Sequence, residues 1–233
     1  MVYKYNESLG KIEHLFTIFA GMKTNLFKSC GRVLLPALGA LLVAGALFWW
    51  DASRPFSLRE RRIIRQSDSL MYVTVVPQDS AILRAVSVDF TPVELASPLL
   101  ETLIAKMLYT VQHPSQDGVG IAAPQVGINR RAVCVQRFDK PGEPFEAYLN
   151  IRIDSLQGNP VIGREGCLSV PGLRGMVPRS PRIVISYVRP GTPTERITET
   201  VEGYTAVIFQ HECDHLEGIL YTDRAVEISA VSD

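Results

Sequence analysis

The pentapeptide His211-Glu212-Cys213-Asp214-His215 is the feature that most limits how this chain can fold. Two histidines four residues apart lie one turn apart on the same face of an α-helix, so both imidazoles can bind one metal ion. Apolar residues throughout 204–216 predict that this helix is buried, and Gly218 is a suitable C-terminal stop. The chain is therefore expected to build its core around a metal-binding helix.

The third metal ligand decides which kind of site this is, because a catalytic tetrahedral site uses three protein ligands and one open position. Protease-type sites with this motif take the third ligand from downstream. Only 18 residues follow His215, and Glu217 and Glu227 are their only glutamates. Upstream, Cys167 lies in the turn-rich segment Glu-Gly-Cys-Leu-Ser, and a thiolate binds Fe(II) or Zn(II) well. Taken alone, Cys167 would equally fit a small buried apolar position.

Composition narrows the function classes. The 233 residues are 46% hydrophobic, which supports a packed core. Lys+Arg and Asp+Glu are both 24, so direct nucleic-acid binding by an overall basic surface is not expected. Four cysteines are too few for a disulfide scaffold of this length.

The pattern of apolar residues predicts an α+β fold. A helical repeat of leucines begins at Thr91-Pro92 and should end at His113-Pro114. Strands and helices are segregated along the chain rather than alternating, which favours α+β over a doubly wound sheet. Four runs predict strands: 132–137, 147–153, 183–188 and 197–201.

Three segments occur in a fixed order: Gly-Val-Gly-Ile-Ala-Ala-Pro-Gln (118–125), Glu-Gly-Cys-Leu-Ser (165–169) and Gln-His-Glu-Cys-Asp-His (210–215). Together they resemble the three signature motifs of the peptide deformylase family, over about residues 81–225. The resemblance implies mixed strands packed around a central metal-binding helix. It also implies a hydrolase that removes the N-formyl group from the N-terminal formylmethionine of new polypeptides.

The resemblance implies a role for each motif residue. Cys167, His211 and His215 would bind one divalent metal ion, Fe(II) in most family members, with Zn(II), Ni(II) or Co(II) as substitutes. Glu212 would carry the proton from water to the leaving amine. The Gln125 side-chain amide and the Leu168 backbone N–H would stabilise the developing oxyanion.

The substrate, a formyl-Met peptide or nascent chain, would lie extended along the glycine-rich segment 118–121. Arg174 matches a family position near the peptide, and could equally be a surface arginine. Asp214 and Glu165 would support the ligands. Cys213 should face away from the metal, into the core. The residues expected to contact the substrate are Val119, Gly120, Gly166, Arg174, Val207 and Ile208.

Two other functions remain open at this point. One is a membrane-tethered zincin-type metalloprotease, which would not need Cys167. The other is a non-catalytic deformylase-like module that tethers ribosomes or nascent chains to a membrane.

An uncharged run of 18 residues, 33–50, precedes this region and reaches the length of a membrane-spanning helix. Trp49 and Trp50 at its end suit a membrane interface. We predict a transmembrane helix here, an N-terminal hydrophobic helix ahead of the folded part. A cleaved secretory signal and a buried soluble helix are the alternatives.

The expected organisation follows from that run. Residues 1–32 would be a cytoplasmic leader, or an artefact of start-site choice if translation begins at Met22. Residues 51–70 would be a charged linker and 71–233 the metal-dependent deformylase domain. Arginines on the C-terminal side of the run favour a membrane-anchored protein with its catalytic domain in the cytoplasm, near ribosomes; an exported form is the alternative.

Overall fold

The computed structural model describes residues 56–66 and 68–231. Its larger sheet has five strands in the order β1-β2-β3-β6-β7, and all neighbouring pairs are antiparallel. Every run predicted as a strand lies in this sheet. The strands are β1 (Gly120–Ala122), β2 (Ala132–Gln136), β3 (Phe145–Gln157), β6 (Arg182–Arg189) and β7 (Thr192–Glu202).

A second, three-stranded sheet was not predicted. It has the order β4-β5-β8, from β4 (Val161–Cys167), β5 (Val170–Arg179) and β8 (Glu227–Ala230). Its strands lack the apolar alternation that predicts a strand from sequence, because β4 is largely exposed and β4 and β5 together contain four glycines. The pairing of β4 with β5 shifts register between Glu165 and Cys167, at the point where the chain turns.

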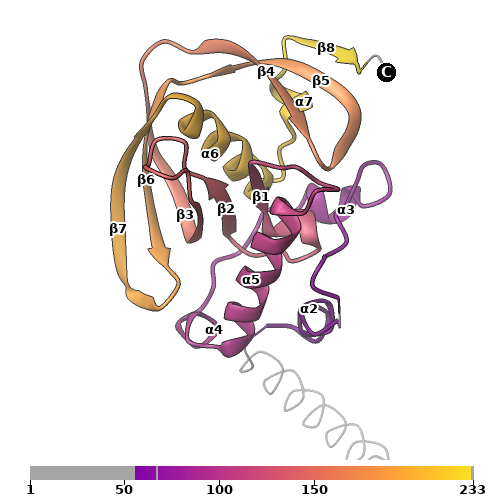
Figure 1. Ribbon diagram of the computed structural model, residues 1–233, viewed down its shortest axis with the longest axis vertical. Helices are drawn as coiled ribbons and strands as arrows, with labels where there is room; N and C mark the ends of the chain where they lie inside the picture. The colour runs from indigo at the N-terminus through magenta and orange to yellow at the C-terminus, as the bar shows by residue number, and fades with distance from the viewer. Residues whose placement is uncertain (1–55, 67, 232–233) are drawn as a thin grey trace, which may run out of the picture. The chain divides into compact units, whose positions relative to one another are not determined.

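Helix α6 (Gly203–Leu216) runs between the two sheets (Figure 1). It packs on the larger sheet through Ala206, Phe209 and Leu216, which share a buried cluster with residues of β2, β3 and β6. Cys213 belongs to the same cluster and is 6% exposed, so its predicted role in core packing is confirmed. Gly218 follows the helix with a φ of 71°, as expected for a C-terminal stop.

The helix predicted from Thr91-Pro92 to His113 is two helices, α4 (Pro92–Leu95) and α5 (Pro98–Gln112). Pro98 accounts for the break, because the residue before a proline is disfavoured in a helix and proline lacks the N–H donor. Ser97 accepts a hydrogen bond from the Leu99 N–H and caps the second helix. The α5 residues then fill the other main core, against β1 and β2.

Residues 51–70 were expected to form a charged linker, and the described part of that segment is folded instead. It contains α2 (Leu58–Ile64), and Phe56 and Ile64 are buried in the same core as α5. Glu60 pairs with Arg130 at 2.9 Å. The linker prediction was wrong for this part because its few buried apolar residues are interspersed with exposed arginines, which dominate the composition of the segment. The remaining short helices are α3 (Ser80–Leu83), η1 (Ala123–Val126) and α7 (Tyr221–Arg224).

The predicted membrane-spanning run 33–50 and the leader 1–32 lie outside the described residues. Within 56–66 and 68–231, no helix is long and apolar enough to cross a membrane.

Candidate metal centre

The three expected ligands converge between the two sheets. His211 and His215 lie one turn apart on α6, with ring centroids 5.1 Å apart. Cys167 ends β4, and its Sγ lies 3.2 Å from Nε2 of His215. One donor atom from each of these residues lies within 4.8 Å of the others. The thiol therefore lies close to both imidazoles although Cys167 and His211 are 44 positions apart in the chain.

The donor set fits a divalent transition metal. One thiolate and two imidazoles suit Fe(II) and Zn(II), and three ligands leave a coordination position open. Burial opposes ionisation of the Cys167 thiol, but His215 and His211 outweigh it and hold its pKa well below the usual value. The lowered pKa favours the thiolate, which is the form that binds metal.

A buried network holds the His211 ring. Oε2 of Glu165 accepts a hydrogen bond from Nδ1 of His211 at 2.8 Å, which leaves the other ring nitrogen to face the cysteine. Arg179 binds both carboxylate oxygens of Glu165, at 2.7 and 3.0 Å. Burial raises the pKa of Glu165, but His211 and Arg179 together lower it to about 2. Glu165 therefore stays ionised and fixes the ring.

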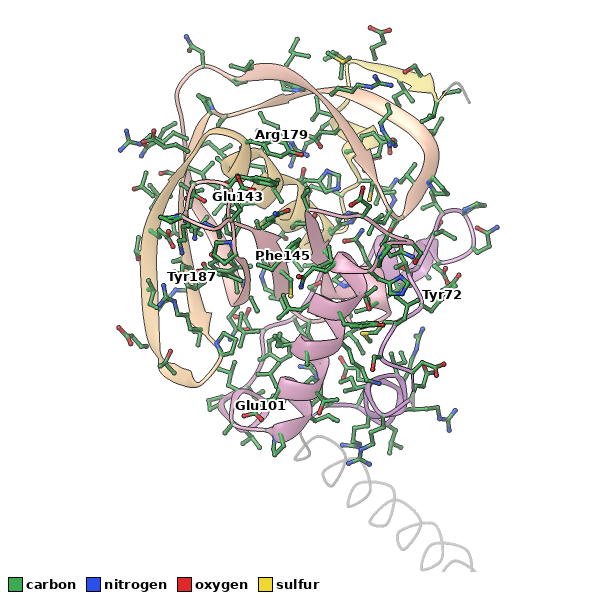
Figure 2. The ribbon with its side chains drawn as sticks, in the orientation of Figure 1. Tyr72, Glu101, Glu143, Phe145, Arg179 and Tyr187 are labelled. Atoms are coloured by element: carbon green, nitrogen blue, oxygen red, sulfur yellow. The ribbon has the colours of Figure 1, made fainter. Side chains whose placement is uncertain are left out.

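The same arginine joins Glu165 to the second half of the motif. Nη1 of Arg179 lies 2.6 Å from a carboxylate oxygen of Asp214, and Arg224 binds both oxygens of Asp214 at 2.7 Å. Arg179 is 5% exposed and lies at the end of β5, beside α6 (Figure 2). Sequence reasoning found both acids but missed Arg179, because only the strand register brings it to them.

Glu212 faces the centre without a hydrogen-bond partner. The residue is 4% exposed, and its Oε2 is a buried oxygen with no bonding partner among the described residues. Burial raises the pKa of Glu212 to about 7, although both histidines oppose the shift. A Cβ on Gly120 would lie 2.5 Å from Oε1 of Glu212, so only glycine allows β1 to pass this close.

Gln125 lies in η1, and its side chain reaches the thiol of Cys167. Its Oε1 accepts a hydrogen bond from the Ala122 N–H at 2.8 Å, which fixes the orientation of the amide. Its Nε2 is then 3.5 Å from Sγ of Cys167 and 3.2 Å from Oγ of Ser169. A side-chain N–H donor is therefore held beside the candidate ligand.

A cavity of about 900 Å³ opens beside these groups. Every residue expected in the site lines it except His215, which is buried and contacts Cys167. These lining residues are Val119, Gly120, Gln125, Gly166, Cys167, Leu168, Arg174, Val207, Ile208, His211 and Glu212. The cavity wall also contains residues that sequence reasoning did not select, among them Asp117, Arg164, Tyr204 and Val231.

Comparison with known proteins places the chain in one family. A family model described as "Polypeptide deformylase" matches residues 72–230, more than half of the chain. A peptide deformylase of Leptospira biflexa is 41% identical over 150 residues, covering 61% of this chain and 82% of the relative. A protein of Bordetella bronchiseptica named "Peptide deformylase 2" is 42% identical over 139 residues, covering 57% and 77%.

Solved structures similar to this chain are also peptide deformylases. A class I type b peptide deformylase from Acinetobacter baumannii, bound to Met-Ala-Ser, is 34% identical with a TM-score of 0.60, covering 66% of this chain and 98% of its own. An actinonin complex of a Synechococcus elongatus peptide deformylase is 28% identical with a TM-score of 0.59, covering 70% and 82%.

Proposed function

This chain belongs to the polypeptide deformylase family and removes the N-formyl group from newly made polypeptides, and we propose that Cys167, His211 and His215 hold the divalent ion of this reaction. The observation that carries the proposal is the meeting of one thiol and two imidazoles within 4.8 Å. A divalent ion bound there supplies Lewis acidity, which lowers the pKa of water and polarises a carbonyl. Fe(II) is the ion we propose, with Zn(II), Ni(II) or Co(II) as substitutes.

Glu212 is the proposed proton carrier. Glu212 lines the cavity beside the ligands, and its Oε2 is buried without a hydrogen-bond partner among the described residues. A carboxylate in this position can take a proton from the attacking water and return it to the leaving amine, the nitrogen of the N-terminal methionine.

Gln125 and Leu168 are proposed to stabilise the oxyanion that forms when water adds to the formyl carbon. The Gln125 amide is held in place by the Ala122 N–H, so its own N–H groups need little reorganisation during the reaction. Leu168 follows the ligand Cys167 directly and lines the same cavity. Loss of one such donor costs about 3 kcal/mol of barrier in other hydrolases.

The peptide is proposed to lie between β1 and the edge of β4, as an added strand. Gly120 and Gly166 both line the cavity and present no side chain of their own to it. The methionine side chain would contact the apolar residues of the wall, and Arg174 would lie beside the peptide further along. The apolar residues are Val119, Val207 and Ile208.

Two substitutions in the full chain, purified without oxygen, test these assignments. Glu212→Gln should keep one bound ion per chain and lose about 10²–10⁴-fold in kcat on formyl-Met-Ala-Ser. Cys167→Ser should lose the ion itself. Glu195→Gln, an exposed glutamate of β7, and Cys213→Ala are the matched controls and should keep both metal and turnover. Full turnover in Glu212→Gln would overturn its role.

The protease alternative is not favoured. It requires a dispensable Cys167, yet Sγ lies 3.2 Å from a histidine of the motif. The non-catalytic alternative is not favoured either, because no motif residue is replaced by one that lacks the needed chemistry.

We also propose that residues 33–50 anchor the protein in a membrane with the catalytic residues on the cytoplasmic side, where formylated chains leave ribosomes. The uncharged 18-residue run and the arginines that follow it support this proposal. A reporter fused after Asp233 should be accessible only from the cytoplasmic side of intact cells. A signal from the opposite side would overturn the orientation.

A further inference from the structure

The outer face of the small sheet carries two arginines next to the cavity. The register pairs Arg164 with Met176 and Glu165 with Gly175, and beyond this point the guanidinium of Arg174 lies against Gly166. Residues at alternate positions share a face of a sheet, so Arg164, Gly166 and Arg174 lie on one face. Arg164 and Arg174 are diagonal neighbours across the two strands, a separation of about 7–8 Å between backbones.

Gly166 has no side chain and so makes room for the guanidinium of Arg174. A Cβ on Gly166 would lie 2.5 Å from Nη1 of Arg174, so the guanidinium of Arg174 occupies the place that a side chain would take. Both arginines and Gly166 line the cavity. The two positive charges therefore flank the position where the proposed peptide passes β4.

Neither arginine is neutralised by a carboxylate in the part of the chain that the structure describes. Nη1 of Arg174 donates to the carbonyl oxygen of Leu173 at 3.0 Å, and Arg164 forms no described hydrogen bond or ion pair. The buried acids of the site are engaged elsewhere: Glu165 binds Arg179 and His211, and Glu212 lies beneath Gly120. Two like charges this close favour an incoming anion.

We propose that Arg164 and Arg174 form a cationic subsite that takes an acidic side chain of the substrate, at the second or third residue of the formyl-Met peptide. This inference rests on the proposed function, because it specifies which formylated chains the same cavity prefers. Arg164 is the specificity-determining residue, since it is exposed and makes no contact that the fold requires.

Asp117 supports the opposite charge preference. It is an exposed acid that lines the same cavity, and it would favour a basic side chain of the substrate if it, rather than the two arginines, determined the preference. Glu227 also lies on the arginines' face, across β5 from Arg164, but does not line the cavity. The sign of the charge preference therefore separates the two possibilities.

The test uses the metal-loaded full chain and six peptides, formyl-Met-X-Ala-Ala and formyl-Met-Ala-X-Ala, with X as Asp, Asn or Lys. At low salt, kcat/KM should be about three-fold higher for Asp than for Lys at one of the two positions. Arg164→Gln should reduce this ratio about two-fold, and Arg164→Glu should invert it. Raising the salt concentration should shrink the ratio in the unmodified protein.

Arg62→Gln is the matched control, because Arg62 is an exposed arginine of α2 outside the cavity. It should leave the ratio unchanged. A preference for Lys, or a ratio that Arg164→Glu does not move, would overturn the subsite. Failure to hydrolyse any of the six peptides would instead contradict the proposed function.

Discussion

Three arginines of the described residues are almost completely buried, and two of them, Arg137 and Arg179, at 1% and 5% exposure, each bind at least two carboxylates through short contacts. Arg137 follows β2 and binds Asp139, Glu146 and Glu199. It also packs against the aromatic rings of Tyr148 and Phe209. Tyr187 completes this cluster on the larger sheet by donating to Glu199 (Figure 2).

Arg179 differs in what its carboxylates touch. Glu165 and Asp214 are themselves buried, and Glu165 holds the ring of a candidate metal ligand. The acids around Arg137 are partly exposed, with 24–32% of each side chain open to solvent, and none contacts a candidate ligand. A buried arginine therefore packs into the larger sheet at one place, and at the other it binds the acid that holds a candidate metal ligand.

Removing Arg179 should have the largest effect. Arg179→Leu leaves Glu165 and Asp214 buried without their shared cation, which should lower the free energy of unfolding by about 3–5 kcal/mol. Because Glu165 would no longer be fixed, metal affinity should fall about 10–100-fold. Urea unfolding and metal competition with a chelator measure the two effects. Unchanged metal affinity in a folded Arg179→Leu protein would contradict the orienting role.

Removing Arg137 should cost less and should spare the metal. Arg137→Met leaves carboxylates that can still be partly hydrated, so we expect a loss of about 1–3 kcal/mol in unfolding free energy. Metal affinity and kcat/KM should match the unsubstituted protein, because the cluster does not reach the cavity. A parallel loss of metal affinity would show that the two clusters are coupled through α6.

The Arg137 cluster should also make stability depend on acidity. Arg137 lowers the pKa of Asp139, and it lowers the pKa of Glu199 against the opposing effect of burial. A folded-state pKa below the unfolded value gives stability that is present above about pH 4.5 and is lost as pH falls through the folded pKa. Between pH 6 and 3, with metal removed, the unfolding free energy should fall less steeply in Arg137→Met. Equal slopes would contradict this assignment.

The two clusters also show what sequence could and could not predict. Local signals were reliable: the spacing of the two histidines marked the motif helix, and apolar runs marked four of the five strands of the larger sheet, all except the short β1. Cys167 was selected because a signature motif marks it, not because its strand was recognised. Its position beside His215 depends on a strand, β4, whose exposed and glycine-containing sequence carries no clear period.

Arg179 and Arg137 could not be selected from sequence for a related reason. Arg179 meets Asp214 across 35 positions of the chain, and Arg137 meets Glu199 across 62. A charged residue in isolation is most simply interpreted as solvated. Only the pairing of strands, which places particular side chains on one face, identifies the arginines that are buried. The same reasoning explains why α2 was taken for a linker.

An exposed arginine–carboxylate pair should contribute least to stability and so extends the comparison of the two buried arginines. Arg84 and Asp223 form a salt bridge with 44% and 40% of their side chains exposed. Arg84→Gln should cost only about 0.2–1 kcal/mol, and the cost should decline as salt is added, because water and ions screen exposed charges. Asp223 is left unchanged because it also accepts from the Leu220 N–H. Arg62→Gln, which removes an exposed arginine without a described partner, should cost less still. If Arg84→Gln destabilised the protein as much as Arg137→Met, burial would not be what separates these arginines, and the number of carboxylate contacts would have to explain the difference.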